Sequence, residues 1–258
     1  MITRNRLLLL NSTVALVLAG TLTVTLHELA HFATALALGH EATLHATSVS
    51  NSSTDDATAI TTAAAGPIFS ILFGLIIVFA ARRWGRGFWR LLWMWLGFTS
   101  AQAGFGYCMI ALLSPAGETG KVLELLGAPW WVGLISLAFG TAGMLWLSRL
   151  FATRVAAYAG EDTRQMMAFG MWPWLFGTLA LVVIYAATVL QLPFMEAFLS
   201  MFGIIAIGVF APMFTFFVLR LHPPREQLEL GVPWVGIAGV ALMVLLILLV
   251  LVPGITLG

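Results

Sequence analysis

Long apolar segments separated by short polar ones run through the whole chain. A helix needs about 20 apolar residues to cross the hydrocarbon core of a bilayer. The pattern therefore predicts an all-α fold with about seven transmembrane helices, at residues 7–37, 58–81, 88–113, 129–150, 171–191, 194–219 and 232–254. The first 20 residues resemble a signal peptide, but the apolar segment continues without a turn signal to Leu38, so we expect the first helix to be retained.

The composition supports a membrane protein and excludes several other classes. Of the 258 residues, 60% are hydrophobic and 9% are charged, which is too little polarity for the surface of a soluble domain. No internal repeat or long linker divides the chain, so we expect residues 1–258 to form a single membrane domain. A net charge of +1 without any basic tract indicates no nucleic-acid partner. The single cysteine, Cys108, excludes an intramolecular disulfide.

Positively charged residues mark one side of the predicted bundle. Every Lys and Arg except Lys121 lies on the same side as the N-terminus: Arg4, Arg6, Arg82, Arg83, Arg86, Arg90, Arg149, Arg154, Arg164, Arg220 and Arg225. Because short loops rich in Lys and Arg stay in the cytoplasm, this asymmetry predicts a cytoplasmic N-terminus and an external C-terminus. We expect a multi-pass integral protein of a bacterial or archaeal cell membrane.

The first predicted helix contains three ionisable side chains in the stretch LTVTLHELAHFATALALG, namely His27, Glu28 and His31. Each costs roughly 2.5–3.5 kcal/mol to insert into a bilayer, so their presence needs a compensating reason. Positions i and i+4 share a helix face, so His27 and His31 can direct two imidazoles at one metal ion, with Glu28 beside them as a general base. This is the H-E-x-x-H arrangement of zinc peptidases. The alternatives are a chance match or histidines hydrogen-bonded to neighbouring helices.

The same stretch resembles the first signature of the site-2 protease family, which are intramembrane zinc metalloproteases that cut the membrane segments of other proteins. In that family the next core helix tends to begin with Ala-Gly-Pro, and this chain has TTAAAGPIFS, with Gly66 and Pro67. The family often has asparagine three residues after the proline, where this chain has Ser70.

The third family signature contains an aspartate that is the third zinc ligand, in the pattern Asp-Gly-Gly-Arg-Ile-Leu. The stretch ALLSPAGETGKVLELLG aligns with it through Glu118, with Thr119 in place of the first glycine and Ala111 in place of an upstream asparagine. The resemblance therefore implies Glu118 as the third ligand. Glu118 as an exposed loop carboxylate paired with Lys121 is the alternative. Five other groups on the same side of the membrane compete as third ligand: His40, His45, Asp55, Asp56 and Glu124.

The resemblance covers about residues 15–125 and implies a metalloprotease-like core of three helices within residues 1–127. Residues 128–258, with the four remaining helices, match no signature, and we expect them to shield the core or to bind a partner. His27 lies roughly 30 Å along the helix from its cytoplasmic start, since each residue rises 1.5 Å. Glu118 lies in an external loop. We therefore expect a site that opens to the exoplasmic side, whereas the family usually holds its zinc nearer the cytoplasm.

Two polar segments have alternative interpretations. The alternation in Ala42–Ser50 is compatible with an extended strand or hairpin, or with a solvated loop. In the resembled family such a segment can pair with an unwound substrate by strand addition. Gln102, with Thr99 and Ser100, either lines the cavity or forms hydrogen bonds between helices.

These observations favour an intramembrane zinc endopeptidase that acts on membrane-protein substrates within the lipid bilayer, with Glu28 as base and with His27, His31 and Glu118 holding Zn²⁺. A proteolytically inactive relative that binds a membrane partner is the second hypothesis, favoured by the altered third signature. A metal transporter is the third, although a transporter has no need of Glu28 between the histidines. The sequence leaves the substrate and the oligomeric state open.

Overall fold

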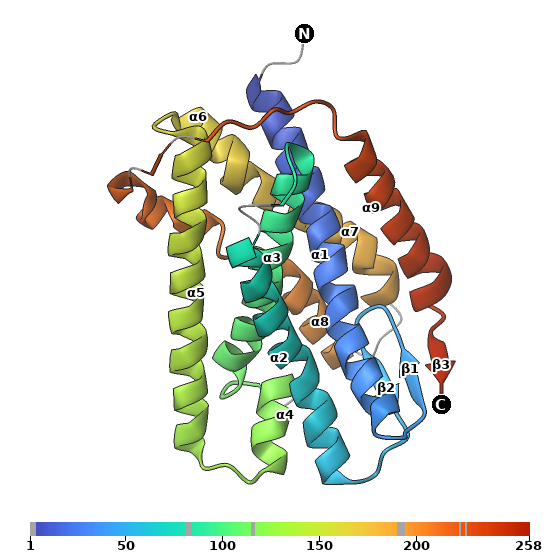
Figure 1. The fold of residues 1–258 in the computed structure, drawn as a ribbon. Coiled ribbons are helices and arrows are strands. Elements are labelled where there is room, and N and C mark those ends of the chain that lie inside the picture. The colour runs from blue at the N-terminus through green and yellow to red at the C-terminus, as the bar shows by residue number, and fades with distance from the viewer. Residues whose placement is uncertain (1–3, 81–83, 115–116, 190–193, 222, 225) are drawn as a thin grey trace.

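The computed structural model describes residues 4–80, 84–114, 117–189, 194–221, 223–224 and 226–258, and these residues are mostly helical (Figure 1). The α-helices are α1 (Arg4–Ala37), α2 (Asp56–Ala80), α3 (Phe88–Ile110), α4 (Glu118–Leu125), α5 (Trp130–Ala159), α6 (Thr163–Met166), α7 (Trp172–Val189), α8 (Phe194–Ala206) and α9 (Trp234–Leu246). Single π-helical turns lie at Met167–Met171 and Ile247–Leu251, and 3₁₀ turns lie at Pro212–Phe216 and Val218–Arg220. Three short strands are β1 (Ala42–Leu44), β2 (Val49–Asn51) and β3 (Ile255–Leu257).

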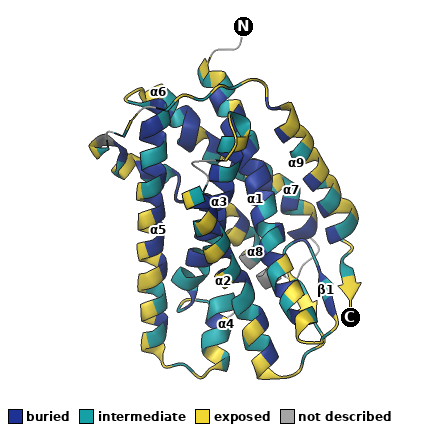
Figure 2. Ribbon diagram, in the orientation of Figure 1, coloured by how far each residue is buried: buried dark blue, intermediate teal, exposed yellow. Residues whose placement is uncertain are grey.

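Helix α1 runs through the middle of the bundle and packs against α2, α3, α7 and α9 (Figure 1). Half of the residues of α1 and more than half of those of α3 are buried, whereas α5 and α9 expose many residues along their length (Figure 2). One hydrophobic core joins side chains from both predicted parts of the chain, such as Trp95 of α3 and Phe151 of α5. The helices after residue 128 therefore pack directly on the first three.

Five described helical segments are long and apolar enough to cross a membrane: Arg4–Ala37, Asp56–Ala80, Trp130–Ala159, Thr163–Val189 and Trp234–Leu251. Their outer faces carry exposed apolar side chains, including Ile76 and Phe79 on α2 and Ile135 and Phe139 on α5. Such faces suit contact with lipid rather than with water. These segments are compatible with an integral membrane protein, while the count of seven spans stays a prediction.

The predicted helix at 194–219 is not continuous. Helix α8 ends at Ala206, and Gly208 then adopts a positive φ of 79°, a conformation that glycine tolerates. Gln102 of α3 satisfies both sides of the break, because its side-chain amide donates to the Ala206 carbonyl (2.8 Å) and accepts from the Gly208 N–H (2.6 Å). Gln102 therefore forms hydrogen bonds to another helical segment, which was one of its two predicted roles.

We predict that Gln102→Leu lowers the free energy of unfolding by about 2–4 kcal/mol, because each buried backbone group left without a partner costs about 1–3 kcal/mol. Denaturation in detergent, followed by circular dichroism, measures the change. Gln165→Leu, at a half-buried glutamine of α6, is the matched control and should change the stability by less than about 0.5 kcal/mol. Equal stability of Gln102→Leu and the wild type would contradict this role.

Other predicted boundaries also shift. Helix α5 continues to Ala159 rather than 150, where Gly160 with φ of 61° ends it. The predicted span 171–191 begins earlier, at Thr163, because the Asp162 side chain accepts hydrogen bonds from the next backbone N–H groups and starts α6 there. The predicted hairpin at 191–193 lies outside the described residues, as do three of the basic residues used for orientation: Arg82, Arg83 and Arg225.

A small antiparallel sheet lies against the C-terminal end of α1, in the strand order β2-β1-β3 (Figure 1). Strands β1 and β2 form a hairpin with Ala42 opposite Asn51, which agrees with the extended alternative for Ala42–Ser50. Strand β3, from the last residues of the chain, pairs with the other edge of β1 and was not predicted. Ala42 and Leu44 are buried with Phe32 and Ala35 of α1, so the sheet belongs to the folded body.

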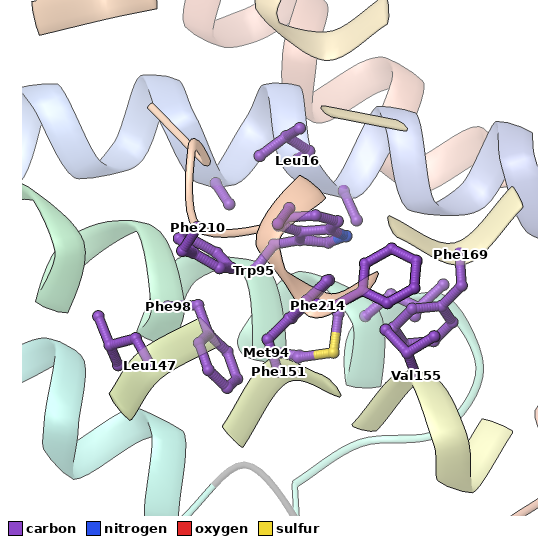
Figure 3. Packing of buried hydrophobic residues seen from close by; sticks show 14 of the residues in the cluster. Leu16, Met94, Trp95, Phe98, Leu147, Phe151, Val155, Phe169, Phe210 and Phe214 are labelled. Atoms are coloured by element: carbon purple, nitrogen blue, oxygen red, sulfur yellow. The ribbon is translucent and has the colours of Figure 1, made fainter. Parts of the chain in front are cut away.

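The aromatic core packs beside Leu16, in the N-terminal half of α1 (Figure 3). Phe151 of α5 contacts Trp95, Phe98, Phe210 and Phe214 at ring-centroid distances of 5.0–6.3 Å. The Trp95 indole N–H donates to the Ser12 hydroxyl (2.8 Å), so the polar edge of this ring has a partner on α1. This packing holds α1, α3 and α5 together and leaves the opposite end of α1 for the polar site.

Candidate metal centre

His27 and His31 of α1 and Glu118, the first residue of α4, converge on one point. The Nε2 atom of His27 lies 2.9 Å from both Glu118 carboxylate oxygens, and the Nε2 atom of His31 lies 3.0 Å from Oε1 of Glu118. The two Nε2 atoms are 3.2 Å apart. Both histidines are buried, and the Glu118 side chain is 21% exposed. One ligand atom from each residue lies within 4.8 Å of the other two, so this group can hold a metal ion.

The Nδ1 atoms of both histidines are bonded to α2. Nδ1 of His31 lies 2.6 Å from the carbonyl oxygen of Thr62, and Nδ1 of His27 lies 2.8 Å from the hydroxyl oxygen of Ser70. A carbonyl can only accept, so Nδ1 of His31 carries the hydrogen, and the neutral ring has its lone pair on Nε2. Hydrogen bonds of this kind fix the tautomer and orientation of a histidine that binds metal. Ser70 thus occupies a useful position although it is smaller than the asparagine of the resembled family.

A cation at the point where these atoms converge would stabilise their arrangement. With Nδ1 protonated, the Nε2 lone pair of a neutral His31 faces a carboxylate oxygen at 3.0 Å and another imidazole nitrogen at 3.2 Å. A proton on His31 or a metal ion at the shared point would remove this repulsion. Tetrahedral ligands with zinc bonds of 2.0–2.1 Å lie about 3.3 Å from one another. The spacing of 2.9–3.2 Å is close to that value, so the residues present fit a metal ion of this size.

Gly66 of α2 leaves room for this group. A Cβ atom at this position would lie 2.3 Å from Nε2 of His31 and 2.7 Å from Nε2 of His27, closer than non-bonded atoms approach. The next residue, Pro67, lacks an N–H and so cannot bond to the Ala63 carbonyl one turn earlier, and the neighbouring Thr62 carbonyl accepts from His31. The Gly-Pro pair therefore brings α2 close to the ligands while leaving their meeting point free.

A tight turn places Glu118 at the start of α4. Gly120 packs against the preceding turn, where a Cβ atom would lie 2.2 Å from the carbonyl oxygen of Ser114. Gly120 corresponds to one of the two glycines in the third family signature. Because α4 is short and lies at the end of the bundle, the Glu118 carboxylate enters the site from that end rather than from within a spanning helix (Figure 1).

Within the described part of the chain, none of the competing ligands joins this group. His40 and Asp55 face one another at 3.9 Å near the start of α2. The Thr58 N–H donates to Asp55 (2.8 Å), which lowers the pKa of this exposed carboxyl and caps the helix. His45 packs under Gly254 beside β3, and the side chains of Asp56 and Glu124 are exposed. Glu118 contacts the two histidines, rather than forming the alternative pair with Lys121.

Glu28 lies next to the ligands without belonging to them. It is 6% exposed and close enough to interact electrostatically with His27, Glu118 and His31. A carboxylate beside a metal position can accept a proton from a water molecule held there. The position of Glu28 on α1, one residue after His27, therefore suits the predicted base.

Tyr107 of α3 is a site residue that sequence reasoning missed. Its ring stacks on the imidazole of His27 with centroids 5.2 Å apart and planes inclined by 14°, and its side chain lies close enough to Glu118 to interact with the carboxylate. The only available signal was weak: Tyr107 is one of three tyrosines in the chain and lies 11 residues before Glu118. No spacing rule connects a residue of one helix to a ligand of the next.

The site lies in the last third of α1, at the end of the bundle that also holds α4 and the sheet (Figure 1). Comparisons with family models, with curated proteins and with solved structures find no match. The structure by itself therefore defines the class of protein: mostly helical, with five candidate membrane spans among the described residues and a group of two buried histidines and Glu118 that can hold a metal ion.

Proposed function

We propose that this protein is an intramembrane zinc endopeptidase, similar to site-2 proteases, that cleaves membrane-protein substrates. The observation that carries the proposal is the meeting of His27, His31 and Glu118 at one point, with Glu28 adjacent on the same helix. The Gly66-Pro67 pair against the histidines supports it, because this is where the second signature of that family falls. Nothing in the donor set is redox-active or soft, and two imidazoles with one carboxylate suit zinc.

In the proposed reaction, the chain supplies the ligands, the base and a protected site. Zinc held by His27, His31 and Glu118 would supply a bound water of lowered pKa and a Lewis acid for the carbonyl of the scissile peptide bond. Glu28 accepts a proton from the attacking water and passes it to the leaving amine nitrogen, as a C–O bond forms and the C–N bond breaks. Ser70 and Thr62 hold the two imidazoles in orientation throughout.

The family resemblance implies that an extended substrate pairs with a strand, and few strand edges in this fold are available for such pairing. Strand β1 already pairs with β2 on one edge and with β3 on the other. Among the described strands, the outer edges of β2 and β3 are the ones that remain available to an added strand. We infer that an extended substrate segment pairs with the β2 edge, since β2 leads within a few residues into α2, which contacts the histidines.

The orientation of the bundle follows from charge. The described arginines lie toward the end at which α1 begins, and Lys121 lies on α4 at the other end. By the positive-inside rule, the α1 start faces the cytoplasm and the metal centre opens to the exoplasmic side. A membrane-embedded chain with its site near the outer interface suits substrates whose cleaved segment lies near that interface.

Metal removal tests this function. We expect the purified protein, incubated in detergent with solubilised membrane proteins of the expression host, to generate new N-termini detectable by mass spectrometry. A zinc chelator such as 1,10-phenanthroline should abolish these termini, and added zinc should restore them, because the base has no activated water without the metal. Bound zinc without any new terminus would instead identify a metal-binding relative that does not cleave, and zinc transport into vesicles would identify a transporter.

A further inference from the structure

The carboxylate of Glu118 differs from the two histidines in how it is held. Each histidine bonds through Nδ1 to α2, so its orientation does not depend on the metal. Among the described residues, the Glu118 side chain is bonded to His27 and His31, and Tyr107 lies close enough to interact with it. Since His27 and His31 would bind metal through the same Nε2 atoms that face Glu118, their contact with the carboxylate is lost when a metal lies between them. Tyr107 is the partner that remains.

Tyr107 is placed to act on two ligands at once. Its hydroxyl can donate to the carboxylate, which can only accept when ionised. Its ring lies nearly parallel to the His27 imidazole, at a centroid distance of 5.2 Å, and limits rotation of that ring. The two ligands come from different helices, α1 and α4, and Tyr107 comes from a third, α3. A single side chain thus connects the two halves of the ligand set.

We propose that Tyr107 is the positioning residue of the metal centre: its hydroxyl orients the Glu118 carboxylate as a ligand, and its ring braces His27. A hydrogen bond to a ligating carboxylate raises metal affinity by restricting the carboxylate before the metal arrives. The proposal rests on the metal centre of the proposed function, but it does not rest on cleavage. The proposal gives α3 a role in the metal centre, whereas the three family-like signatures name no residue equivalent to Tyr107.

Tyr107→Phe tests the hydroxyl alone, because phenylalanine lacks the hydroxyl but keeps the ring that stacks on His27. We expect its zinc affinity to fall about 10–100-fold, the usual effect of losing a hydrogen bond to a ligand. The visible absorption of the cobalt-substituted protein should change as well, since the carboxylate binds in a different orientation. Tyr107→Leu, which also removes the ring, should lose more affinity. The thermal midpoint of the metal-free protein should be the same in Tyr107→Phe and in the wild type. A hydroxyl that only stabilised the fold would instead lower this midpoint when removed.

Tyr158→Phe is the matched control. Its hydroxyl also donates to a glutamate, Glu226 at 2.9 Å, but at the other end of the bundle. This variant should bind zinc and cobalt as the wild type does. Wild-type affinity and an unchanged cobalt spectrum in Tyr107→Phe would overturn the proposal, and so would a wild-type protein that binds no metal.

A measurement on the wild-type chain avoids any dependence on the folding of a variant. Tyrosine labelled with ¹³C at Cζ gives three signals, one per tyrosine, and zinc should shift the signal of Tyr107 most. Tyr158→Phe and Tyr185→Phe assign the other two signals by their loss. If all three signals are insensitive to bound zinc, the proposal is wrong. If zinc shifts the Tyr107 signal but the protein cleaves nothing, the proposed peptidase function fails while the positioning role stands.

Discussion

Glu28→Gln is expected to lower peptide hydrolysis by about 10²–10⁴-fold, the usual contribution of a general base, while the protein keeps its zinc. The amide has the shape of the carboxylate but does not accept the proton of the attacking water at neutral pH. Zinc retention is expected because the ligand atoms belong to His27, His31 and Glu118, and Glu28 lies beside them. The appearance of new N-termini measures the first effect, and elemental analysis measures the second.

The control for this substitution is Glu124→Gln, which makes the same chemical change at an exposed glutamate on α4. It should leave both zinc content and cleavage unchanged. A Glu28→Gln protein with wild-type cleavage would show that another group takes the proton. A Glu28→Gln protein that loses its zinc would show that Glu28 is a ligand, and the assignment of Glu118 would then have to be revised.

Gly66→Ala should empty the metal centre, with bound zinc falling below about a tenth of the wild-type content. The added methyl group would lie 2.3 Å from Nε2 of His31 and 2.7 Å from Nε2 of His27. Neither imidazole can retreat without breaking its Nδ1 bond to Thr62 or Ser70. The methyl group therefore occupies the space in which the ligand atoms meet. Elemental analysis of the purified protein gives the result directly, with His27→Ala as the reference for a site that lacks a ligand.

Gly106→Ala is the matched control for Gly66→Ala. Gly106 lies in α3, one residue before Tyr107, and a Cβ atom at this position would meet no other atom within 4 Å. Alanine favours a helix over glycine by about 1 kcal/mol, so neither change should unfold the chain through helix propensity. Full zinc in Gly106→Ala and none in Gly66→Ala is the expected pair. Full zinc in Gly66→Ala would mean that α2 does not approach the ligands as closely as described.

The metal centre also explains how three ionisable side chains are tolerated within apolar helices. His27, Glu28 and His31 are all buried, and each would be costly in lipid on its own. For the two histidines, the bonds to Ser70 and Thr62 and the contacts with Glu118 replace lost hydration. The Glu118 carboxylate comes from α4, at the end of the bundle, and its side chain remains 21% exposed.

Local periodicity determined part of this protein without any knowledge of its fold. The apolar segments indicated helices because a spanning helix must satisfy its own backbone hydrogen bonds. The i, i+4 spacing put His27 and His31 on one face, since a helix repeats every 3.6 residues. These inferences depend on neighbours along the chain, and the structure agrees with them in α1, α2 and α3.

Contacts between distant residues were decided by the tertiary structure alone. Resemblance to a signature suggested Glu118 as a ligand, but its approach to His27, 91 residues away, depends on how α4 packs against α2 and α3. The break after α8 depends on Gln102 from α3, and the third strand comes from the end of the chain. Tyr107 reaches two ligands on two other helices, which no pattern within its own helix encodes. The sequence thus determined which side chains share a helix face, because periodicity is local. Packing decided which faces meet, because a metal centre is assembled from several helices.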